Sequence, residues 1–284
     1  MAVNQSYIDQ TGREVRIPFP PRRIVSLVPS QTELLFDLGL ENEIIAVTRF
    51  CIHPENNKPR IGGTKRLRIQ EITALQPDLI IANKEENDRE QVESLMQDFP
   101  VWVTDVHDLE SALEMIGQLS MITNRAEKGE QLCAAIQKAF GELKLLQAKG
   151  PDFFKNNGTS LVKQNEENLI TGNEPFPSKV KVAYFIWKDP WMVAGGDTFI
   201  ASMLEQCGLE NIFKDSTRYP VISPEELQHT GCQLVLLSSE PFPFKQSHSA
   251  FFPNLPVLLV DGEMFSWYGS RILRAAAYFR EIFY

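Results

Sequence analysis

Two residues of one loop have side chains that can bind a soft or borderline metal ion. Cys51 and His53 stand two positions apart, directly after a predicted strand. A thiolate and a neutral imidazole are both good ligands for such ions. Two ligands do not complete a metal site, however, and a loop thiol and imidazole are often only packed. Metal ligation and simple packing therefore both remain open for Cys51 and His53.

A second loop combines two large aromatic rings with a cation. Trp187 and Trp191 enclose Lys188 in the run WKDPW, again directly after a predicted strand. Two tryptophans in five loop residues are costly to expose to water, and exposed apolar patches mark binding surfaces. We therefore expect these three residues to contact a large planar or macrocyclic ligand. The alternative is a loop that packs onto its own lobe.

A dense polar run follows a third predicted strand. Its residues Lys84, Glu85, Glu86 and Asn87 can form hydrogen bonds to a polar ligand. The two glutamates are also suitable oxygen ligands for a hard cation. The alternative interpretation is a solvated helix start, where acidic charge is favourable.

Further candidate contacts lie elsewhere in the chain. Phe50 precedes the Cys51 loop, and Lys65 ends the glycine-rich run GGTK, which lacks the spacing of a phosphate-binding loop. Trp267 and Tyr268 open the predicted terminal helix and can form a second aromatic wall. Arg271, one turn later, is a candidate salt-bridge partner within that helix.

These segments belong to an alternating pattern of strands and helices. The first 122 residues begin with a predicted hairpin and continue with short apolar strands separated by helices, which is typical of a mostly parallel sheet. Ser30 is expected to cap the helix 31–38, with Glu33 completing a capping box and Gly39 ending the helix.

The pattern divides the chain into four parts. We expect an α/β lobe at 1–122, a bridging helix at 123–149, a polar loop or insertion at 150–178, and a second α/β lobe at 179–284. The predicted fold is thus α/β, with two lobes that contain mostly parallel central sheets and are joined by one long helix. Clefts between domains are preferred ligand sites, so the ligand is expected there.

Composition and charge exclude several classes of function. The formal net charge is −9, which disfavours nucleic-acid binding. No apolar run reaches the length of a membrane span. The four cysteines lack zinc-knuckle or cluster spacing, and no catalytic motif is present, so we expect no enzyme and no required cofactor. The N-terminus lacks a signal-peptide pattern, so we expect either a cytoplasmic protein or one whose export signal was removed.

Four stretches of the sequence resemble one protein family. They are RIVSLVPSQTELLFDLG, LQPDLIIA, GLENIFKDS and DGEMFSWYGSRILRAA. Together they resemble the helical-backbone substrate-binding proteins that capture cobalamin, haem, siderophores and metals for ABC importers, and in particular the vitamin B12-binding branch. The resemblance covers nearly the whole chain except 150–178. It implies a two-lobed α/β fold with a rigid bridging helix. We expect the protein to be a monomer.

The resemblance also implies a partner. Members of the family dock onto an ABC permease dimer through one acidic residue on each lobe. Glu225 keeps that position in the second lobe, whereas Gln70 occupies the matching position of the first lobe, with Glu71 next to it. Glu71 and Glu225 are therefore the docking candidates, and both also suit the acidic first turn of an ordinary helix.

Two functions follow from the sequence. The first is a binding protein that captures a corrinoid such as cobalamin, or an iron chelate such as haem or a ferric siderophore, in an interlobe cleft for an ABC importer. The second is a cytoplasmic metal- or cofactor-binding homologue that engages no transporter.

Overall fold

The computed structural model describes residues 3–147 and 179–284, which form two compact units. Unit 1 comprises Met1–Ile136 and Trp267–Leu273, and unit 2 comprises Gln137–Ser266 and Arg274–Tyr284. The predicted insertion at 150–178 lies outside the described residues. Helix α5 (Ala126–Gln147) begins in unit 1 and ends in unit 2. Its 22 residues correspond to a length of about 33 Å.

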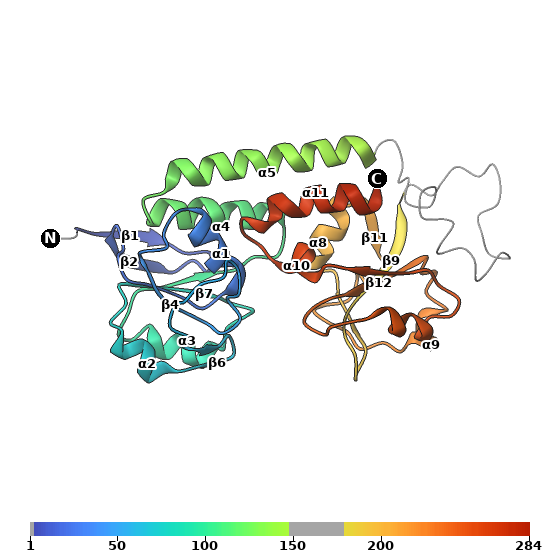
Figure 1. Ribbon diagram of the computed structural model, residues 1–284, viewed down its shortest axis with the longest axis horizontal. Coiled ribbons are helices and arrows are strands. Elements are labelled where there is room, and N and C mark those ends of the chain that lie inside the picture. The colour runs from blue at the N-terminus through green and yellow to red at the C-terminus, as the bar shows by residue number, and fades with distance from the viewer. Residues whose placement is uncertain (1–2, 148–178) are drawn as a thin grey trace. The chain divides into compact units, whose positions relative to one another are not determined.

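Unit 1 is built around a four-stranded parallel sheet. The strand order is β4-β3-β7-β8, and every neighbouring pair is parallel. Helix α4 and the first half of α5 lie on one side of this sheet, and α2 and α3 lie on the other (Figure 1). The elements of unit 1 before α5 are β1 Val3–Ile8, β2 Glu14–Phe19, β3 Ile24–Ser26, α1 Pro29–Asp37, β4 Ile44–Val47, β5 Gly62–Gly63, β6 Arg66–Leu67, α2 Ile69–Ala74, β7 Leu79–Asn83, α3 Arg89–Leu95, β8 Val101–Thr104 and α4 Leu109–Ile122.

Unit 2 repeats the parallel arrangement. Strands β9, β12 and β13 are parallel neighbours, β11 pairs with β9 in the same sense, and β10 pairs with β9 antiparallel. The elements of unit 2 after α5 are β9 Val180–Trp187, β10 Met192–Val193, α8 Phe199–Gln206, β11 Leu209–Asn211, α9 Pro224–Leu227, β12 Leu234–Ser238, the 3-10 helix η1 Gln246–Phe251, β13 Val257–Val260, α10 Gly262–Ser266 and α11 Arg271–Phe283.

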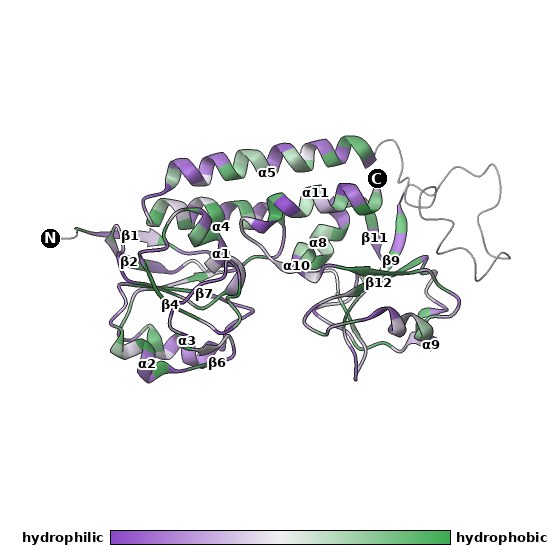
Figure 2. Cartoon of the chain, viewed as in Figure 1, coloured by the Kyte–Doolittle hydropathy of each residue, from purple (hydrophilic) through white to green (hydrophobic). Residues whose placement is uncertain are grey.

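Hydropathy explains why these segments form buried sheets. All five residues of β7 and all five of β12 are buried. Figure 2 shows β12 in green, whereas α5 alternates between green and purple along its length, as expected for a helix with one covered face. The α/β fold with two parallel sheets, predicted from the sequence, is confirmed.

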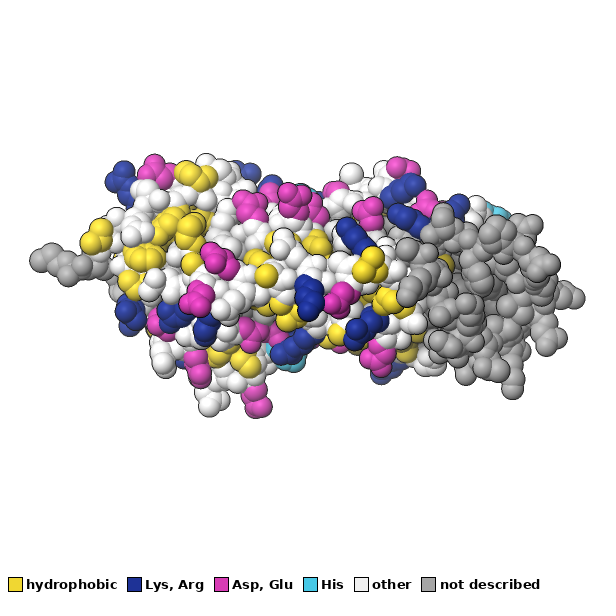
Figure 3. Space-filling view, turned by 90° about the horizontal axis from the view of Figure 1, so that it is seen from above, with side chains coloured by type: hydrophobic (Ala, Val, Ile, Leu, Met, Phe, Trp, Pro, Cys, Tyr) yellow, Lys and Arg dark blue, Asp and Glu magenta, His cyan; other side chains and the backbone are white. Residues whose placement is uncertain are grey.

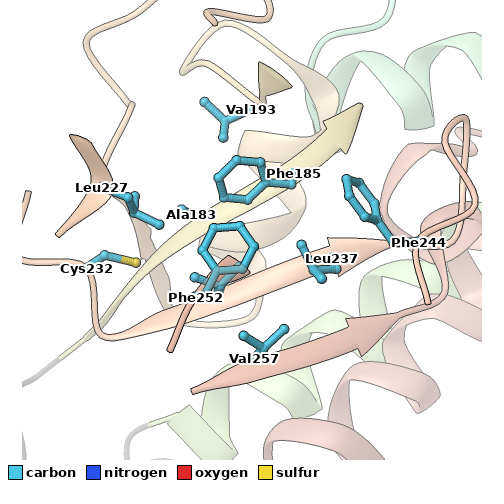
Figure 4. Packing of buried hydrophobic residues seen from close by; sticks show 10 residues of the cluster. Ala183, Phe185, Val193, Leu227, Cys232, Leu237, Phe244, Phe252 and Val257 are labelled. Atoms are coloured by element: carbon cyan, nitrogen blue, oxygen red, sulfur yellow. The ribbon is translucent and has the colours of Figure 1, made fainter. Parts of the chain in front are cut away.

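The core of unit 2 is strongly aromatic. Phe185 of β9 packs on Phe252 with ring centroids 5.1 Å apart, and both are buried. Figure 4 shows this cluster, in which Phe244 lies next to the arrowhead of β12.

The outer surface is polar: acidic and basic side chains are interspersed over the face drawn in Figure 3. None of the described helices is both long and apolar enough to cross a bilayer.

Two local predictions are wrong. Helix α1 begins one residue before Ser30, because Pro29 occupies its first turn, and its N-cap residue Val28 provides no side-chain cap. Glu33 therefore does not form a capping box. Trp267 and Tyr268 also do not open the terminal helix: that helix, predicted at 270–283, is α11 Arg271–Phe283, and the two aromatic residues lie between α10 and α11.

Glu33 instead forms a buried ion pair with Arg271. Nε and one terminal nitrogen of the guanidinium donate to the two carboxylate oxygens of Glu33, both at 2.8 Å. The side chains are only 5% and 6% exposed. Gly269 lies nearby, where an added Cβ would come within 2.7 Å of the Ser30 carbonyl oxygen. The ion pair and this close approach hold the segment Trp267–Leu273 in unit 1.

The thiol of Cys51 is part of the core of unit 1. Cys51 is fully buried, and its Sγ lies 3.1 Å from the hydroxyl oxygens of both Thr32 and Thr48. Burial raises the pKa of the Cys51 thiol, and the hydrogen bonds with the two threonines only partly offset this effect. The thiol therefore stays protonated at neutral pH.

We expect Glu33→Gln to lower the free energy of unfolding by about 3–5 kcal/mol, because it removes the negative charge that pairs with the buried Arg271 guanidinium. Urea unfolding followed by circular dichroism measures the loss. The matched control is Glu71→Gln, which removes the exposed pair with Arg68 (3.3 Å; side chains 53% and 61% exposed) and should cost less than about 1 kcal/mol. Equal losses of unfolding free energy in the two variants would contradict the conclusion that the Glu33–Arg271 ion pair stabilises the fold.

The Cys51 thiol of the native protein should react at least ~100-fold more slowly with Ellman's reagent at pH 8 than the same thiol in the unfolded chain, because the thiolate is the reactive form. Peptide mapping after blocking identifies the site. Cys133, which is only half-buried, should react before it. Rapid labelling of Cys51 in the native protein would show that its thiolate is accessible.

Candidate ligand-binding surfaces

The predicted ligand residues of unit 1 gather at one edge of its sheet. Strands β4 and β7 end at Val47 and Asn83, and parallel pairing through β3 places their carboxyl ends at the same edge. The loops 49–53 and 84–87 both follow these strand ends. Ligands of open parallel sheets bind outside this edge, so the position agrees with a binding surface.

Lys65 and Asn87 use their polar atoms to build the loop 84–87. The Lys65 ammonium donates to the carbonyl oxygens of Glu85 (2.6 Å) and Asn87 (3.3 Å). The Asn87 amide donates to the carbonyl oxygens of Leu27 and Thr64, and its Oδ1 accepts from the Asn83 N–H at 2.8 Å. Asn87 is also buried. These contacts give both side chains a structural role.

Other candidates of this edge remain at the surface. Phe50 is 45% exposed, and the Arg49 guanidinium lies 4.7 Å from the centre of its ring. Lys84 and Glu85 are exposed, and the Lys84 ammonium pairs with Asp105 at 2.5 Å. Phe50, Lys84 and Glu85 are therefore within reach of a ligand, as is the exposed Lys65, and their role as contacts stays a prediction.

Trp267 and Tyr268 are mostly covered. They are 9% and 6% exposed. The Trp267 ring lies edge-on to His53, with centroids 5.5 Å apart, and the Arg271 guanidinium stands 4.7 Å from its centre. The Tyr268 hydroxyl donates to the carboxylate of Glu86. Both rings thus pack within unit 1, and a direct contact with ligand stays a prediction.

The geometry favours packing over metal ligation for Cys51 and His53. The thiol is buried and protonated, whereas a metal ligand must be a thiolate. The imidazole packs on Trp267. Within residues 3–147 and 179–284, no three His, Cys, Asp or Glu side chains are grouped to hold a metal ion.

Unit 2 carries a connected cluster of aromatic side chains where β9 and β12 end, and part of it is exposed. Trp187 is 39% exposed, and its ring centroid lies 5.8 Å from that of Phe242, which in turn lies 4.7 Å from Phe244. Trp191 stacks on Phe244 at 5.8 Å and meets Phe251 edge-on at 5.2 Å. We use the name aromatic surface for Trp187, Trp191, Phe242, Phe244, His248 and Phe251. Trp187 and Phe251 are its exposed members, whereas Phe244 is buried and connects the others.

The polar groups of the aromatic surface are already oriented. The Lys188 ammonium lies 5.6 Å from the centre of the Trp191 ring and pairs with Asp189 at 2.6 Å. His248 accepts a hydrogen bond on Nδ1 from the Lys245 N–H at 2.8 Å. The neutral imidazole therefore carries its proton on Nε2, so in this conformation His248 is a donor and not a metal ligand.

Sequence reasoning found only part of this surface. Trp187, Lys188 and Trp191 were predicted from the WKDPW run, whereas the partners in 242–251 were not. The signal was present, because the run EPFPFKQSHSAFF has four phenylalanines between two predicted strands. The structure also leaves Trp191 only partly exposed, packed onto its own unit.

The two docking candidates are solvent-exposed. Glu225 lies in the first turn of α9, which Ser223 caps, and Glu71 lies in the first turn of α2. Gln70 beside it is also exposed. Transporter docking through these residues stays a prediction.

Comparison with known proteins identifies the family. The family model for periplasmic binding proteins matches residues 24–251. The vitamin B12-binding protein of Pectobacterium atrosepticum is 25% identical over 262 residues, which cover 90% of this chain and 86% of that protein. The vitamin B12-binding protein of Vibrio campbellii is 28% identical over 214 residues, covering 73% and 67% respectively.

Solved structures agree on the fold. The periplasmic vitamin B12 binding protein of Vibrio cholerae has a TM-score of 0.73 at 22% identity, covering 93% of this chain and 97% of that one. The periplasmic heme-binding protein from Roseiflexus sp. RS-1 has a TM-score of 0.71 at 19% identity, covering 92% and 98%. The resemblance to helical-backbone substrate-binding proteins is confirmed, and this is a family of binding proteins and not of enzymes. The chain belongs to the periplasmic binding protein family.

Proposed function

We propose that this chain captures a metal-bearing macrocycle or chelate, namely a corrinoid such as cobalamin, haem or a ferric siderophore, and delivers it to an ABC importer. Two kinds of support exist. Relatives with 25% and 28% identity are vitamin B12-binding proteins, and proteins of the same fold bind vitamin B12 or haem. The chain's own residues supply the second.

The aromatic surface of unit 2 is the observation that carries the proposal. Exposed Trp187 and Phe251 would be costly to leave in water without use. Trp191 and Phe242, which are partly exposed, extend the apolar area around them, and a conjugated macrocycle offers a flat face of similar character. The surface follows the carboxyl ends of β9 and β12, where open parallel sheets bind their ligands.

Unit 1 can contribute polar contacts. Phe50, Lys84 and Glu85 are exposed at the carboxyl edge of its sheet. We propose that Lys84 and Glu85 form hydrogen bonds with polar groups of a ligand and that Phe50 adds an apolar contact.

Delivery to a transporter is proposed from the exposed acidic residues. The Glu225 carboxylate can pair with an arginine of a permease in bidentate geometry. Glu71 already pairs with Arg68 at 3.3 Å, and Gln70 carries no charge. We therefore propose that unit 2 provides the stronger docking contact.

A metal-handling protein without a transporter has less support. Cys51 is buried and protonated, and the parts of the chain that the structure describes hold no group of metal-binding side chains. Within the described residues a bare ion thus lacks a group of ligands, and the exposed aromatic rings of unit 2 favour a large ligand with an apolar face.

Adding cyanocobalamin or haemin should quench the tryptophan fluorescence and raise the melting temperature, because the ligand covers Trp187. Fluorescence is corrected for ligand absorbance with free tryptophan, and calorimetry gives the affinity. Trp187→Ala should weaken binding of the preferred ligand about tenfold, the equivalent of about 1.4 kcal/mol.

Leu145→Ala is the matched control, because Leu145 is an exposed hydrophobic residue of α5 (70% exposed), and it should leave the affinity unchanged. If neither cyanocobalamin, haemin nor a ferric siderophore changes the fluorescence or melting temperature, the proposed function is wrong.

A further inference from the structure

One edge of the unit 1 sheet is completed by side chains and not by a strand. β8 is the last strand of the order β4-β3-β7-β8, so one side of its backbone faces away from the sheet. The carbonyl oxygens of Pro100 and Thr104 accept hydrogen bonds from the β7 side, both at 2.9 Å. Because the backbone groups of successive strand residues point to opposite sides, the outward groups belong to Val101, Val103 and Asp105.

The tip of the β1–β2 hairpin supplies acceptors for two of these outward groups. The Val103 N–H donates to the Asp9 carboxylate at 3.3 Å. The Asp105 N–H donates to Gln10 Oε1 at 3.1 Å. Val103 is only 6% exposed, and a buried N–H needs such a partner. The two side-chain oxygens thus take the place that the carbonyl oxygens of a fifth strand would take.

Arg13 closes the third outward group and orients the carboxylate. Its guanidinium donates to the Val101 carbonyl oxygen at 2.8 Å and to Asp9 Oδ2 at 2.6 Å. Asp9 Oδ1 accepts from the N–H groups of Thr11 and Arg13, both at 3.0 Å, and the Asp9 side chain is fully buried. We use the name edge plug for Asp9, Gln10 and Arg13.

The opposite edge of the same sheet is closed by main chain. The Val47 N–H of β4 donates to the Pro59 carbonyl oxygen, and the Ile61 N–H donates to the Val47 carbonyl oxygen, both at 3.0 Å. The segment 59–61 therefore covers β4 as a strand would. At β8 the cover consists of three side chains from a separate hairpin.

The hairpin that carries the edge plug has a small buried surface. Five of the six residues of β1 are exposed, and Val15 and Ile17 are the buried residues of β2. The two strands form a sheet of their own. A two-stranded hairpin is marginally stable by itself, and elements with few buried contacts open at the lowest free energy. The edge plug can therefore withdraw while the parallel sheet stays folded.

We propose that the β8 edge is a site for addition of a strand, that the edge plug keeps it closed, and that its partner after withdrawal of the plug is β8 of a second copy. The strand has the sequence VWVT, with no charge and no proline to prevent pairing. Two copies of β8 can pair antiparallel about a two-fold axis, which is the usual symmetry of a dimer.

The outward groups of β8 are complementary to themselves. In an antiparallel register centred on Val103, each Val103 N–H donates to the Val103 carbonyl oxygen of the other copy. The same register places the Asp105 N–H opposite the Val101 carbonyl oxygen. The three groups that the edge plug satisfies in the monomer are thus the groups that a second β8 would satisfy in a dimer.

The first test removes the two acceptors of the edge plug without changing β8. In dilute Asp9→Ala/Gln10→Ala, the amides of Val103 and Asp105 should exchange with D₂O at least about tenfold faster than in the wild-type protein. The amide of Ile80, which donates to β8 from inside the sheet, should exchange at an unchanged rate. Mass spectrometry with electron-transfer fragmentation resolves the individual amides.

The same variant should self-associate. Sedimentation velocity from about 2 to about 200 µM should show a dimer that forms with concentration, whereas the wild-type protein stays monomeric. In the dimer the amides of Val103 and Asp105 should again exchange slowly, because the second strand covers them. The matched control Gln5→Ala/Glu14→Ala removes one amide and one carboxylate from exposed positions of the same hairpin and should leave exchange and mass unchanged.

The wild-type protein provides an independent measurement if the double variant does not fold. In urea below the unfolding transition, the amides of Val103 and Asp105 should open together with those of the β1–β2 hairpin and before that of Ile80. Opening of all these amides in one step overturns the inference. A folded variant that keeps slow exchange at both amides, stays monomeric at the highest concentration, or forms a dimer in which both amides still exchange fast also overturns it.

Discussion

Parallel strand pairing is the constraint on which the rest of the structure depends. In a parallel sheet all carboxyl ends lie at one edge, so loops that are distant in sequence become neighbours. In unit 1 this brings together the loops after β4 and β7, which hold Phe50 and Lys84. In unit 2 it brings Trp187, the last residue of β9, next to Phe242 after β12. The same backbone pattern thus creates one candidate surface per unit, and the side chains decide what each surface can bind.

A buried ion pair fixes the position of the segment Trp267–Leu273, which is the second constraint on the structure. Trp267–Leu273 belongs to unit 1, although the chain before and after it belongs to unit 2. The bidentate pair between Glu33 and Arg271 holds this segment, because two desolvated charges are stable only in a fixed, fully hydrogen-bonded geometry. Trp267 and Tyr268 are consequently packed in place, and they help to build unit 1 more than they offer surface to a ligand.

The sequence predicted the fold well and the site only in part. Apolar strands separated by helices identified both parallel sheets, because their periodicity is a local property. Ser30 was misread as a cap because Pro29 and the distant Arg271 determine how α1 begins and what Glu33 binds, and neither contact is local. The ring partners of Trp187 and Trp191 in the segment 242–251 were missed because ring-to-ring contacts depend on which strands are neighbours. Asn87 and Lys65 do lie at the carboxyl edge of the unit 1 sheet, as predicted. Their hydrogen bonds stabilise the loop 84–87, however, and these contacts cannot be predicted from the sequence.

Hydrogen–deuterium exchange of the wild-type protein, with and without saturating cyanocobalamin, tests most directly whether the ligand lies on the aromatic surface of unit 2. The backbone N–H groups of 187–192 and 242–251 should exchange more slowly in the presence of ligand, because a macrocycle that covers these rings restricts both loops. Slower exchange elsewhere, with both segments unchanged at saturation, would contradict the account.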